Sequence, residues 1–333
     1  MNPYLSIVVA ARNDDYGGNF LHRMSVFLKV LLALSEKHRL SAELLVVDWN
    51  PPPDKPSLAA VFREAARSAP AEIRFIQVPS EIHRRMLNAE RMPMFEYIGK
   101  NVGIRRARGR FVLSTNPDIV FNEPLIQFFA SRALDPQAFY RVDRFDVDWR
   151  VPLEEPVQRQ LRFCADHTIR INRKEGTFPT WRDLRAFFSG SNLNRMARQT
   201  AAEVLFRGNA ANGTGIHGNA SGDFLLMGRD HWHALRGYPE LKTHSHIDTY
   251  GCFLAQSLGL KQIALKPPRH IYHQEHDRSE QAKRPQTSFD EIHRLGKKML
   301  ETGRPEITND ENWGLGDQSL PEERGILNQC ASS

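Results

Sequence analysis

Short apolar runs alternate with amphipathic segments along the first part of the chain. The runs are rich in β-branched residues and end in polar clusters, whereas the segments between them carry apolar side chains at helical spacing. This β-α-β-α-β-α-β order predicts an α/β fold with a mostly parallel central sheet, joined by crossover helices that flank it. The predicted elements are strands at 5–10, 43–48 and 73–79, a fourth strand beginning at 111, and helices at 20–34, 57–67 and 95–106.

Acidic side chains stand where three of these strands end. Asp14 follows the first strand, Asp48 ends the second, and Asp118 lies in a polar cluster after the fourth. Because ligands bind beyond the carboxyl ends of parallel strands, these carboxylates would gather at one edge of the sheet. Asn116 and Asp118 offer two oxygen side chains for one hard cation and the diphosphate that it neutralises. The alternative is a turn in which Asn-Pro-Asp only breaks the chain.

Beyond residue 135 the pattern is less regular, and charged residues interrupt the apolar runs. A segment rich in glycine and asparagine, 209–218, predicts either a loop that closes over a ligand or a plain surface connection. Trp313 is an isolated aromatic residue that we expect to dock onto the body of the protein. The other elements expected here are a strand at 139–147, a helix at 157–169, a loop at 170–190, a helix at 250–258, a strand at 261–265 and a helix at 289–301.

The composition is that of an ordinary globular protein, with 333 residues of which 41% are hydrophobic and 25% are charged. No apolar run reaches the ~18 residues of a membrane span, and no basic region precedes the first apolar run as it would in a secretory signal. The three cysteines are far apart and odd in number, which argues against a disulfide framework. We therefore expect a cytoplasmic protein.

The chain carries a net charge of +6 and has a pI near 9.3. Such a balance suits an anionic ligand, an acidic membrane surface or a nucleic acid, although a solvated basic face is the simpler interpretation. Zinc-ligand spacing and an aromatic RNA platform are missing from the sequence, so we expect no nucleic-acid partner. The sequence has neither a G-x-G-x-x-G after the first strand nor a P-loop. Four arginines cluster before the fourth strand: Arg105, Arg106, Arg108 and Arg110.

Four motifs follow one another in a fixed order between residues 4 and 276. They are Ser6–Asn13, Leu45–Asn50, Asn101–Arg110 and Leu235–Glu240. Their order resembles that of the GT-A glycosyltransferases of the large, inverting family 2 type. In that family the third motif leads into an Asp-x-Asp that binds metal and donor diphosphate. The fourth resembles the family's Gly-Gly-Phe-Asp-Glu stretch, which precedes an acidic catalytic motif.

The resemblance implies a GT-A fold, similar to a Rossmann fold, with an acceptor-side insertion and a C-terminal extension. Residues 1–135 would form the half that binds the nucleotide-sugar, 136–278 the acceptor half with its insertion, and 279–333 the extension. The implied reaction moves a sugar from a nucleoside diphosphate sugar, with a UDP-sugar as first choice, to a hydroxyl of a glycan or lipid-linked acceptor. It would invert configuration and use Mn²⁺ or Mg²⁺. The implied setting is bacterial surface polysaccharide synthesis, such as capsule, with the basic surface in peripheral contact with the inner face of the membrane.

The resemblance also assigns roles to individual residues of this sequence. For the metal we expect Asp118, with His273 and His276 as further ligands. The expected catalytic base is Asp248, with Asp223 as second choice, although Asp248 at a helix start would also suit the helix dipole. The expected acceptor contacts are His217, Trp232 and Tyr238, although core packing is the better explanation for both aromatic residues. The expected donor contacts are Ala11, Asn13, Asp14, Asp48, Asn101, Arg105, Asn116 and Asp118.

Two departures from the family pattern keep other functions open. Asn116 stands where the first aspartate of Asp-x-Asp usually sits, and the usual Glu-Asp pair is reduced to Ile247-Asp248. One alternative is therefore a non-catalytic relative that binds nucleotide-sugar or glycan. A nucleotidyltransferase is disfavoured, because the loop after the first strand is acidic where a triphosphate would lie. A third alternative is a metal hydrolase built on His244, His246 and the histidines at 270–276.

Overall fold

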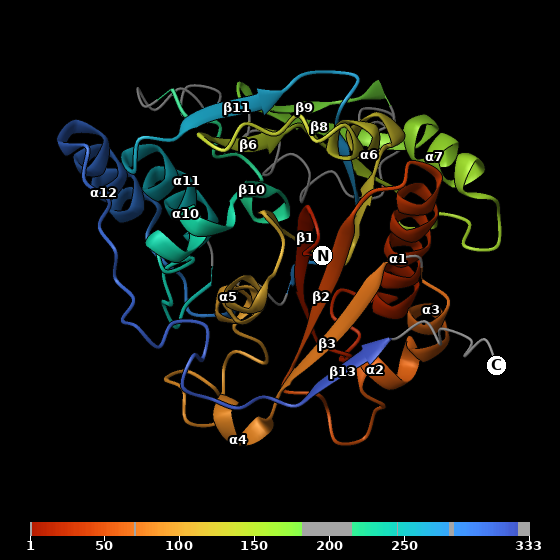
Figure 1. Ribbon diagram of the computed structural model, residues 1–333, viewed down its shortest axis with the longest axis horizontal. Coiled ribbons are helices and arrows are strands. Elements are labelled where there is room, and N and C mark those ends of the chain that lie inside the picture. The colour runs from red at the N-terminus through yellow and green to blue at the C-terminus, as the bar shows by residue number, and fades with distance from the viewer. Residues whose placement is uncertain (1, 70, 182–214, 245, 280–282, 326–333) are drawn as a thin grey trace.

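The computed structural model describes residues 2–69, 71–181, 215–244, 246–279 and 283–325. Within these residues the strands form an eight-stranded sheet and a five-stranded sheet, and helices cover both faces of the larger one (Figure 1). The predicted loop at 209–218 lies partly outside the described residues. No helix in the described part of the chain is long and apolar enough to cross a membrane.

The larger sheet confirms the predicted fold class. Its strand order is β11-β6-β10-β4-β1-β2-β3-β13, in which β10 and β13 run antiparallel to their neighbours and the other strands share one direction. The chain adds β2 and β3 on one side of β1 and then returns to add β4 on the other side, so its direction of progress reverses at β1 and β4. The strand bounds are β1 Leu5–Ala11, β2 Ala42–Trp49, β3 Glu72–Val78, β4 Phe111–Thr115, β6 Ala138–Val142, β10 Leu225–Gly228, β11 Lys261–Leu265 and β13 Glu322–Gly325.

The smaller sheet has the order β5-β12-β7-β8-β9 and lies beyond the carboxyl ends of β4 and β6. The chain passes from one sheet to the other at two short breaks, Asn116–Asp118 between β4 and β5 and Asp143 between β6 and β7. The expected single strand at 139–147 is therefore wrong, because Asp143 divides it between two sheets. The expected loop at 170–190 is also wrong in its first part, which forms β8 and β9. The bounds are β5 Ile119–Phe121, β7 Arg144–Val147, β8 Thr168–Arg173, β9 Gly176–Pro179 and β12 Ile271–Gln274.

Alternation along the central strands divides the apolar core into two layers. Ile7 and Val9 of β1 face the layer that contains helix α1, whereas Val8 and Ala10 face the layer that contains α5 and α11. A Cβ on Gly103 would lie 2.4 Å from Val8 Cγ1, so only glycine lets α5 approach β1 this closely. The helices are α1 Phe20–Lys37, α2 Leu58–Val61, α3 Arg63–Arg67, α4 Ser80–His83, α5 Glu96–Arg106, α6 Glu123–Ala130, α7 Val157–Asp166, α10 Arg229–Ala234, α11 Ile247–Ser257 and α12 Phe289–Thr302.

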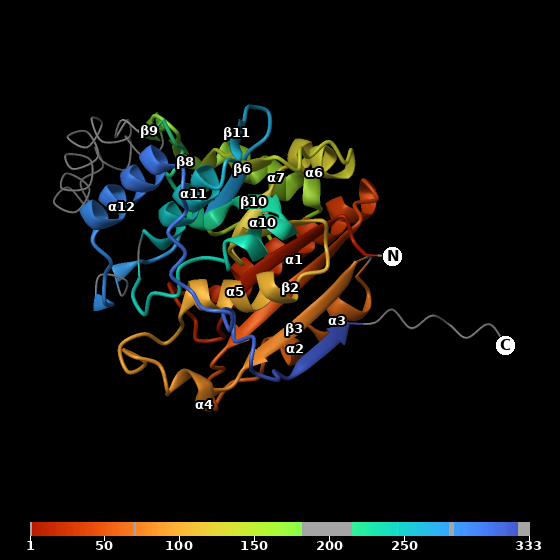
Figure 2. The same ribbon diagram turned by 60° about the vertical axis from the view of Figure 1, so that its left-hand side comes forward.

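The C-terminal extension packs against the body and closes one edge of the larger sheet. α12 lies beside α11, and β13 pairs with β3 (Figure 2). Trp313 is 4% exposed within the core layer of α5, which confirms the expected docking. Arg105 donates hydrogen bonds to the carbonyls of Glu311 and Trp313, and Arg106 to three carbonyls between residues 314 and 318. These two arginines of the predicted basic cluster therefore hold the extension in place.

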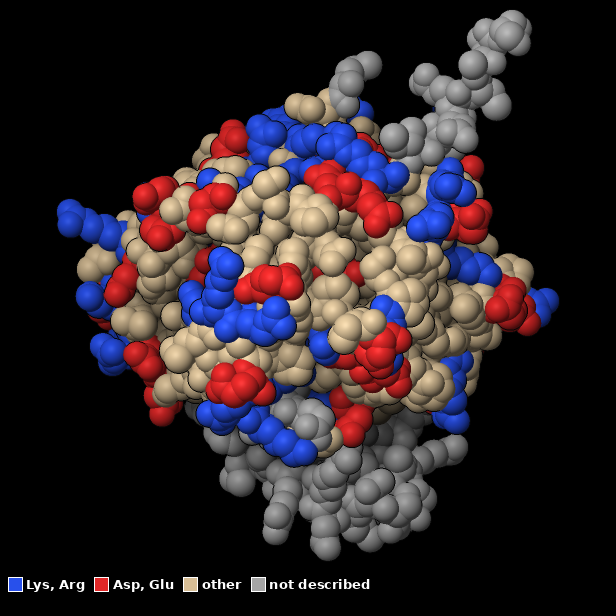
Figure 3. Space-filling model, turned by 90° about the horizontal axis from the view of Figure 1, so that it is seen from below, with Lys and Arg blue, Asp and Glu red and all other residues tan. Residues whose placement is uncertain are grey.

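Charges of both signs are mixed on the face below β13 and α4. In Figure 3, Lys and Arg side chains alternate with Asp and Glu around an area of uncharged residues. Arg108, also of the predicted basic cluster, forms ion pairs with Glu43 and Glu72. Part of the positive charge of that cluster is thus paired within the protein rather than presented to a partner.

Candidate functional site

A cavity of about 770 Å³ lies at the carboxyl ends of β1 and β4. This is the point at which the sheet's order of strands reverses, where open α/β sheets bind their ligands. Its wall includes the loop after β1, the turn after β4, the 3₁₀ turn Ser221–Asp223 before β10, and residues near the end of β12. The cavity therefore lies at the edge where the sequence predicts a gathering of acidic side chains.

Asp118, in the turn after β4, is the centre of a buried group of basic side chains. Its Oδ2 lies 2.9 Å from an Arg23 guanidinium nitrogen, 3.3 Å from His276 Nε2 and 3.7 Å from His273 Nε2. Burial raises the pKa of this carboxyl, but the neighbouring His273, His276 and Arg23 outweigh burial and lower it. Asp118 is therefore ionised, and its buried Oδ1 has no hydrogen-bond partner among the described residues.

Arg23 is a site residue that sequence reasoning missed. It lies on α1 between apolar residues that face the core, and it is only 1% exposed. A charged residue on the apolar face of an amphipathic helix needs a buried partner, so its place in the helical pattern was the signal that could have found it.

His273, on β12, is oriented by a second carboxylate. Its Nδ1 lies 3.2 Å from Asp146 Oδ1, which leaves Nε2 directed towards Asp118. A carboxylate on the far ring nitrogen fixes the tautomer and frees the other nitrogen as a ligand. Asp146 is itself fully buried. Its contacts with Arg144, Arg170 and Asn172 compensate for the burial of its charge.

The side chains of Asp118, His273 and His276 fit a divalent cation. One ligand atom from each lies within 4.8 Å of the other two, and the unpartnered Oδ1 of Asp118 is a further oxygen donor. A second group, Asp146, His273 and Glu275, is equally close. In that group both carboxylates pair with Arg170, and Asp146 pairs with Arg144 as well. The first group has a single carboxylate paired with one arginine, Arg23, so it suits a cation better.

Of the histidines in the hydrolase alternative, only His273 and His276 share a group of metal-ligand residues in the described part of the chain. His244 and His246 line the cavity, but neither belongs to a group of three metal-ligand residues in the described part of the chain. His270 stacks on Phe145 with ring centroids 4.3 Å apart and contacts Asn122 instead.

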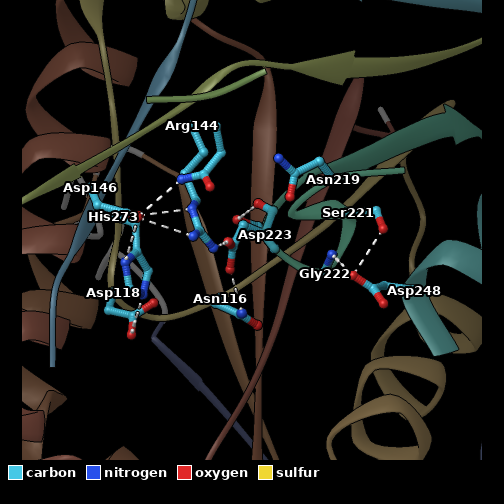
Figure 4. A network of polar contacts seen from close by, with 12 residues as sticks. Asn116, Asp118, Arg144, Asp146, Asn219, Ser221, Gly222, Asp223, Asp248 and His273 are labelled. Atoms are coloured by element: carbon cyan, nitrogen blue, oxygen red, sulfur yellow. Dashed lines mark hydrogen bonds and ion pairs between the residues drawn. The ribbon is translucent and has the colours of Figure 1, made fainter. Parts of the chain in front are cut away.

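Asn116 and Asp223 meet across the cavity edge (Figure 4). Asn116 Nδ2 donates to Asp223 Oδ1 at 2.7 Å, and the other carboxylate oxygen, Oδ2, accepts from Arg144. Burial raises the pKa of Asp223, but Arg144 and His273 outweigh burial and lower it. Arg144 also contacts Asp146, so one guanidinium connects Asp223 with the carboxylate that orients His273.

Asp248, at the start of α11, combines a structural contact with exposure to the cavity. Its Oδ2 accepts hydrogen bonds from Ser221 Oγ at 2.8 Å and from the Gly222 amide at 2.6 Å. These bonds hold the 3₁₀ turn that carries Asp223. None of the described residues forms a hydrogen bond with Asp248 Oδ1, and Asp248 lines the cavity.

The predicted donor residues at the strand ends divide into two groups. Ala11, Asp14, Asn116 and Asp118 line the cavity, and Arg12 beside them pairs with Asp14 at 2.7 Å. Asn13 instead donates to the carbonyl of Pro56, and Asp48 Oδ2 accepts from the amide of Leu58 at the start of α2. Neither Asn13 nor Asp48 is part of the cavity wall.

Asn101 and Arg105, also predicted to bind the donor, lie on α5 and have structural partners outside that helix. Asn101 Nδ2 donates to the carbonyl of Tyr238 at 2.8 Å and to Glu240, while its Oδ1 accepts from the Tyr238 amide. Gly237, with φ +74°, lies against this side chain, and a Cβ there would meet Asn101 Oδ1 at 2.2 Å. The third and fourth sequence motifs are thus joined through Asn101.

The three predicted acceptor residues are buried, and none of them is part of the cavity wall. Trp232 and Tyr238 pack on each other with ring centroids 4.9 Å apart, and Trp232 Nε1 donates to the carbonyl of Val112. His217 is 1% exposed and lies 3.7 Å from Asp143. The core interpretation of Trp232 and Tyr238 is therefore the one that their surroundings support, because a buried ring has no face left for an acceptor.

The chain was compared with family models, curated proteins and solved structures. No family model matches the chain, and no curated protein matches it either. Among solved structures, the crystal structure of S. aureus TarS superimposes with a TM-score of 0.46 and 12% sequence identity. The match covers 94% of this chain and 41% of the other, so this chain spans about two fifths of that protein's length.

Proposed function

We propose that this protein is a GT-A glycosyltransferase that moves a sugar from a nucleoside diphosphate sugar to an acceptor hydroxyl. The observation that carries the proposal is the meeting of Asp118, His273 and His276 beside a ligand-sized cavity at the reversal point of the sheet. The order of the four sequence motifs supports the same conclusion. A glycan or lipid-linked acceptor and a role in bacterial surface polysaccharide synthesis, such as capsule, belong to the same proposal.

The donor diphosphate would lie beside Asp118. A cation held by Asp118, His273 and His276, either Mn²⁺ or Mg²⁺, would supply positive charge to the leaving diphosphate. Arg23 holds Asp118 in place, and Asp146 holds His273. The nucleoside, with uridine as first choice, would lie towards Ala11 and Asp14 at the end of β1.

Asp248 is the better placed base for the acceptor. Asp248 lines the cavity, and its Oδ1 forms no hydrogen bond with a described residue, which supports this role, whereas both oxygens of Asp223 are already engaged. As the acceptor oxygen bonds to the anomeric carbon, its proton passes to Asp248. The bond from that carbon to the diphosphate oxygen breaks, and the diphosphate leaves with the electron pair. Attack from the side opposite the diphosphate inverts the configuration.

Release of nucleoside diphosphate tests this proposal. Purified protein is mixed with Mn²⁺, UDP-sugars and other nucleoside diphosphate sugars, together with a panel of glycan acceptors. We expect acceptor-dependent release of one diphosphate, and Asp248→Asn should slow it about 10²–10⁴-fold because a general base is lost. Asp230→Asn, which changes an exposed aspartate, is the control.

Other outcomes would favour the alternatives. Donor binding without release under any condition would indicate a non-catalytic binding protein. Hydrolytic activity that survives Asp118→Asn would indicate the histidine-site hydrolase instead.

A further inference from the structure

Hydrogen bonds hold the backbone carbonyl and both side-chain oxygens of Asp223 in place. Thr115 Oγ1 donates to its backbone carbonyl at 2.7 Å, Asn116 holds Oδ1, and Arg144 holds Oδ2. The residue is 5% exposed, and that remaining surface is part of the cavity wall. Its carboxylate is therefore held in one orientation at the cavity wall before a ligand binds.

Two roles that a carboxylate in this cavity could have do not suit Asp223. Arg144 lowers its pKa, and a weaker base takes a proton from an acceptor hydroxyl less readily. In the described part of the chain, neither group of three metal-ligand residues includes it. Asp223 is thus neither the better base nor a ligand in the cation cluster.

Asp223 lies between the proposed diphosphate site at Asp118 and the proposed base, Asp248. On one side, Asn116 connects it to the turn that carries Asp118, where the diphosphate would bind. On the other side, the 3₁₀ turn connects it to Asp248, where the acceptor would be deprotonated. Figure 4 shows the residues in this order. The donor's sugar, which links diphosphate to acceptor, would therefore pass beside Asp223.

We propose that Asp223 is a specificity-determining residue that accepts hydrogen bonds from the hydroxyls of the donor's sugar. Each carboxylate oxygen can accept two hydrogen bonds, and the protein supplies one to each. The remaining lone pairs call for donors from the ligand, and hydroxyl groups provide them. This role rests on the proposed function, and Asn116 and Arg144 serve in it as positioning residues.

The same contacts explain why residue 116 is an amide. An aspartate at this position would place two carboxylates 2.7 Å apart at the site of the present hydrogen bond, and like charges at that distance repel strongly. Asn116→Asp recreates the family's Asp-x-Asp, yet it should weaken sugar binding rather than improve it.

Calorimetric titration separates the sugar from the nucleotide. For wild type, Asp223→Asn and the control Asp230→Asn, the affinity for a nucleoside diphosphate is compared with that for the corresponding nucleotide-sugar, with Mn²⁺ present. Loss of a hydrogen bond to a charged group should weaken nucleotide-sugar binding about 10–100-fold in Asp223→Asn and leave diphosphate binding within about twofold of wild type. Asn116→Ala, which buries no new charge, should give a smaller loss in the same direction.

The sharpest comparison moves the carboxylate from residue 223 to residue 116. Asn116→Asp should lose the affinity gained from the sugar, and the double variant Asn116→Asp/Asp223→Asn should not regain it, because Arg144 then faces an amide. This inference would be overturned if the sugar raised the affinity by the same factor in wild type and Asp223→Asn, or if it raised the affinity of neither. The nucleotide site would still stand after either result. Absence of binding by any nucleotide would overturn the proposed function together with it.

Discussion

Asp48 and Asp118 are both buried acids at the ends of parallel strands, yet their surroundings move their pKa values in opposite directions. Asp118 is buried among two histidines and Arg23, which lower its pKa in spite of burial. For Asp48, burial is the main effect and raises the pKa to about 6, because only the Leu58 amide and a more distant Arg12 favour its charge. The position of an acid at a strand end was predictable, but its charged partners come from distant segments.

Asp48→Asn should stabilise the protein at neutral pH. With a folded pKa of about 6 and an unfolded pKa near 3.8, the folded state binds more protons between these values, so wild-type stability falls as pH rises through them. Asparagine does not titrate, so the stability of the variant does not fall over this pH range. Urea unfolding at pH 7 should give a free energy of unfolding up to about 3 kcal/mol higher for the variant, and almost no difference at pH 4. For the exposed control Asp230→Asn, the difference in free energy of unfolding from wild type should not depend on pH. The same pH independence in Asp48→Asn would contradict this explanation.

At the scale of elements, the local periodicity of the sequence predicts the first half of the fold well. The buried strands β1, β2, β3 and β4 and the helices between them carry patterns that do not depend on distant partners. The short strands β8 and β13 were missed because they carry charges and depend on partners from elsewhere in the chain. β13, for example, has the sequence Glu-Glu-Arg-Gly and joins β3 through ion pairs between Glu322 and Arg74.

Asn101 illustrates how a motif that indicates function can act through packing. Asn101→Ala should remove its three hydrogen bonds and leave the buried Tyr238 amide without its partner, at a cost of about 2–3 kcal/mol. Urea unfolding should show that loss, while the folded variant keeps its affinity for nucleoside diphosphates. The exposed Asn312 provides the control Asn312→Ala. Loss of nucleotide affinity at unchanged stability would instead support direct contact between Asn101 and the donor.

At the scale of the whole molecule, the candidate site lies where the two sheets meet. Asp118 and Asn116 belong to the turn by which the chain leaves the larger sheet, and Asp146 and His273 belong to the smaller one. A cation bound by Asp118, His273 and His276 would therefore connect both sheets. Because a ligand that binds only the folded state stabilises it, Mn²⁺ at 100 times its Kd should add about 2.7 kcal/mol to the free energy of unfolding.

The central claim is that this junction binds a nucleoside diphosphate through a cation held by Asp118. Its most direct test is calorimetric titration of wild type, Asp118→Asn and the control Asp230→Asn with a panel of nucleoside diphosphates, each with and without Mn²⁺. We predict Mn²⁺-dependent binding of one diphosphate, UDP as first choice, in wild type and control but not in Asp118→Asn. Failure of every diphosphate to bind the wild type, or equal binding by Asp118→Asn, would contradict the account.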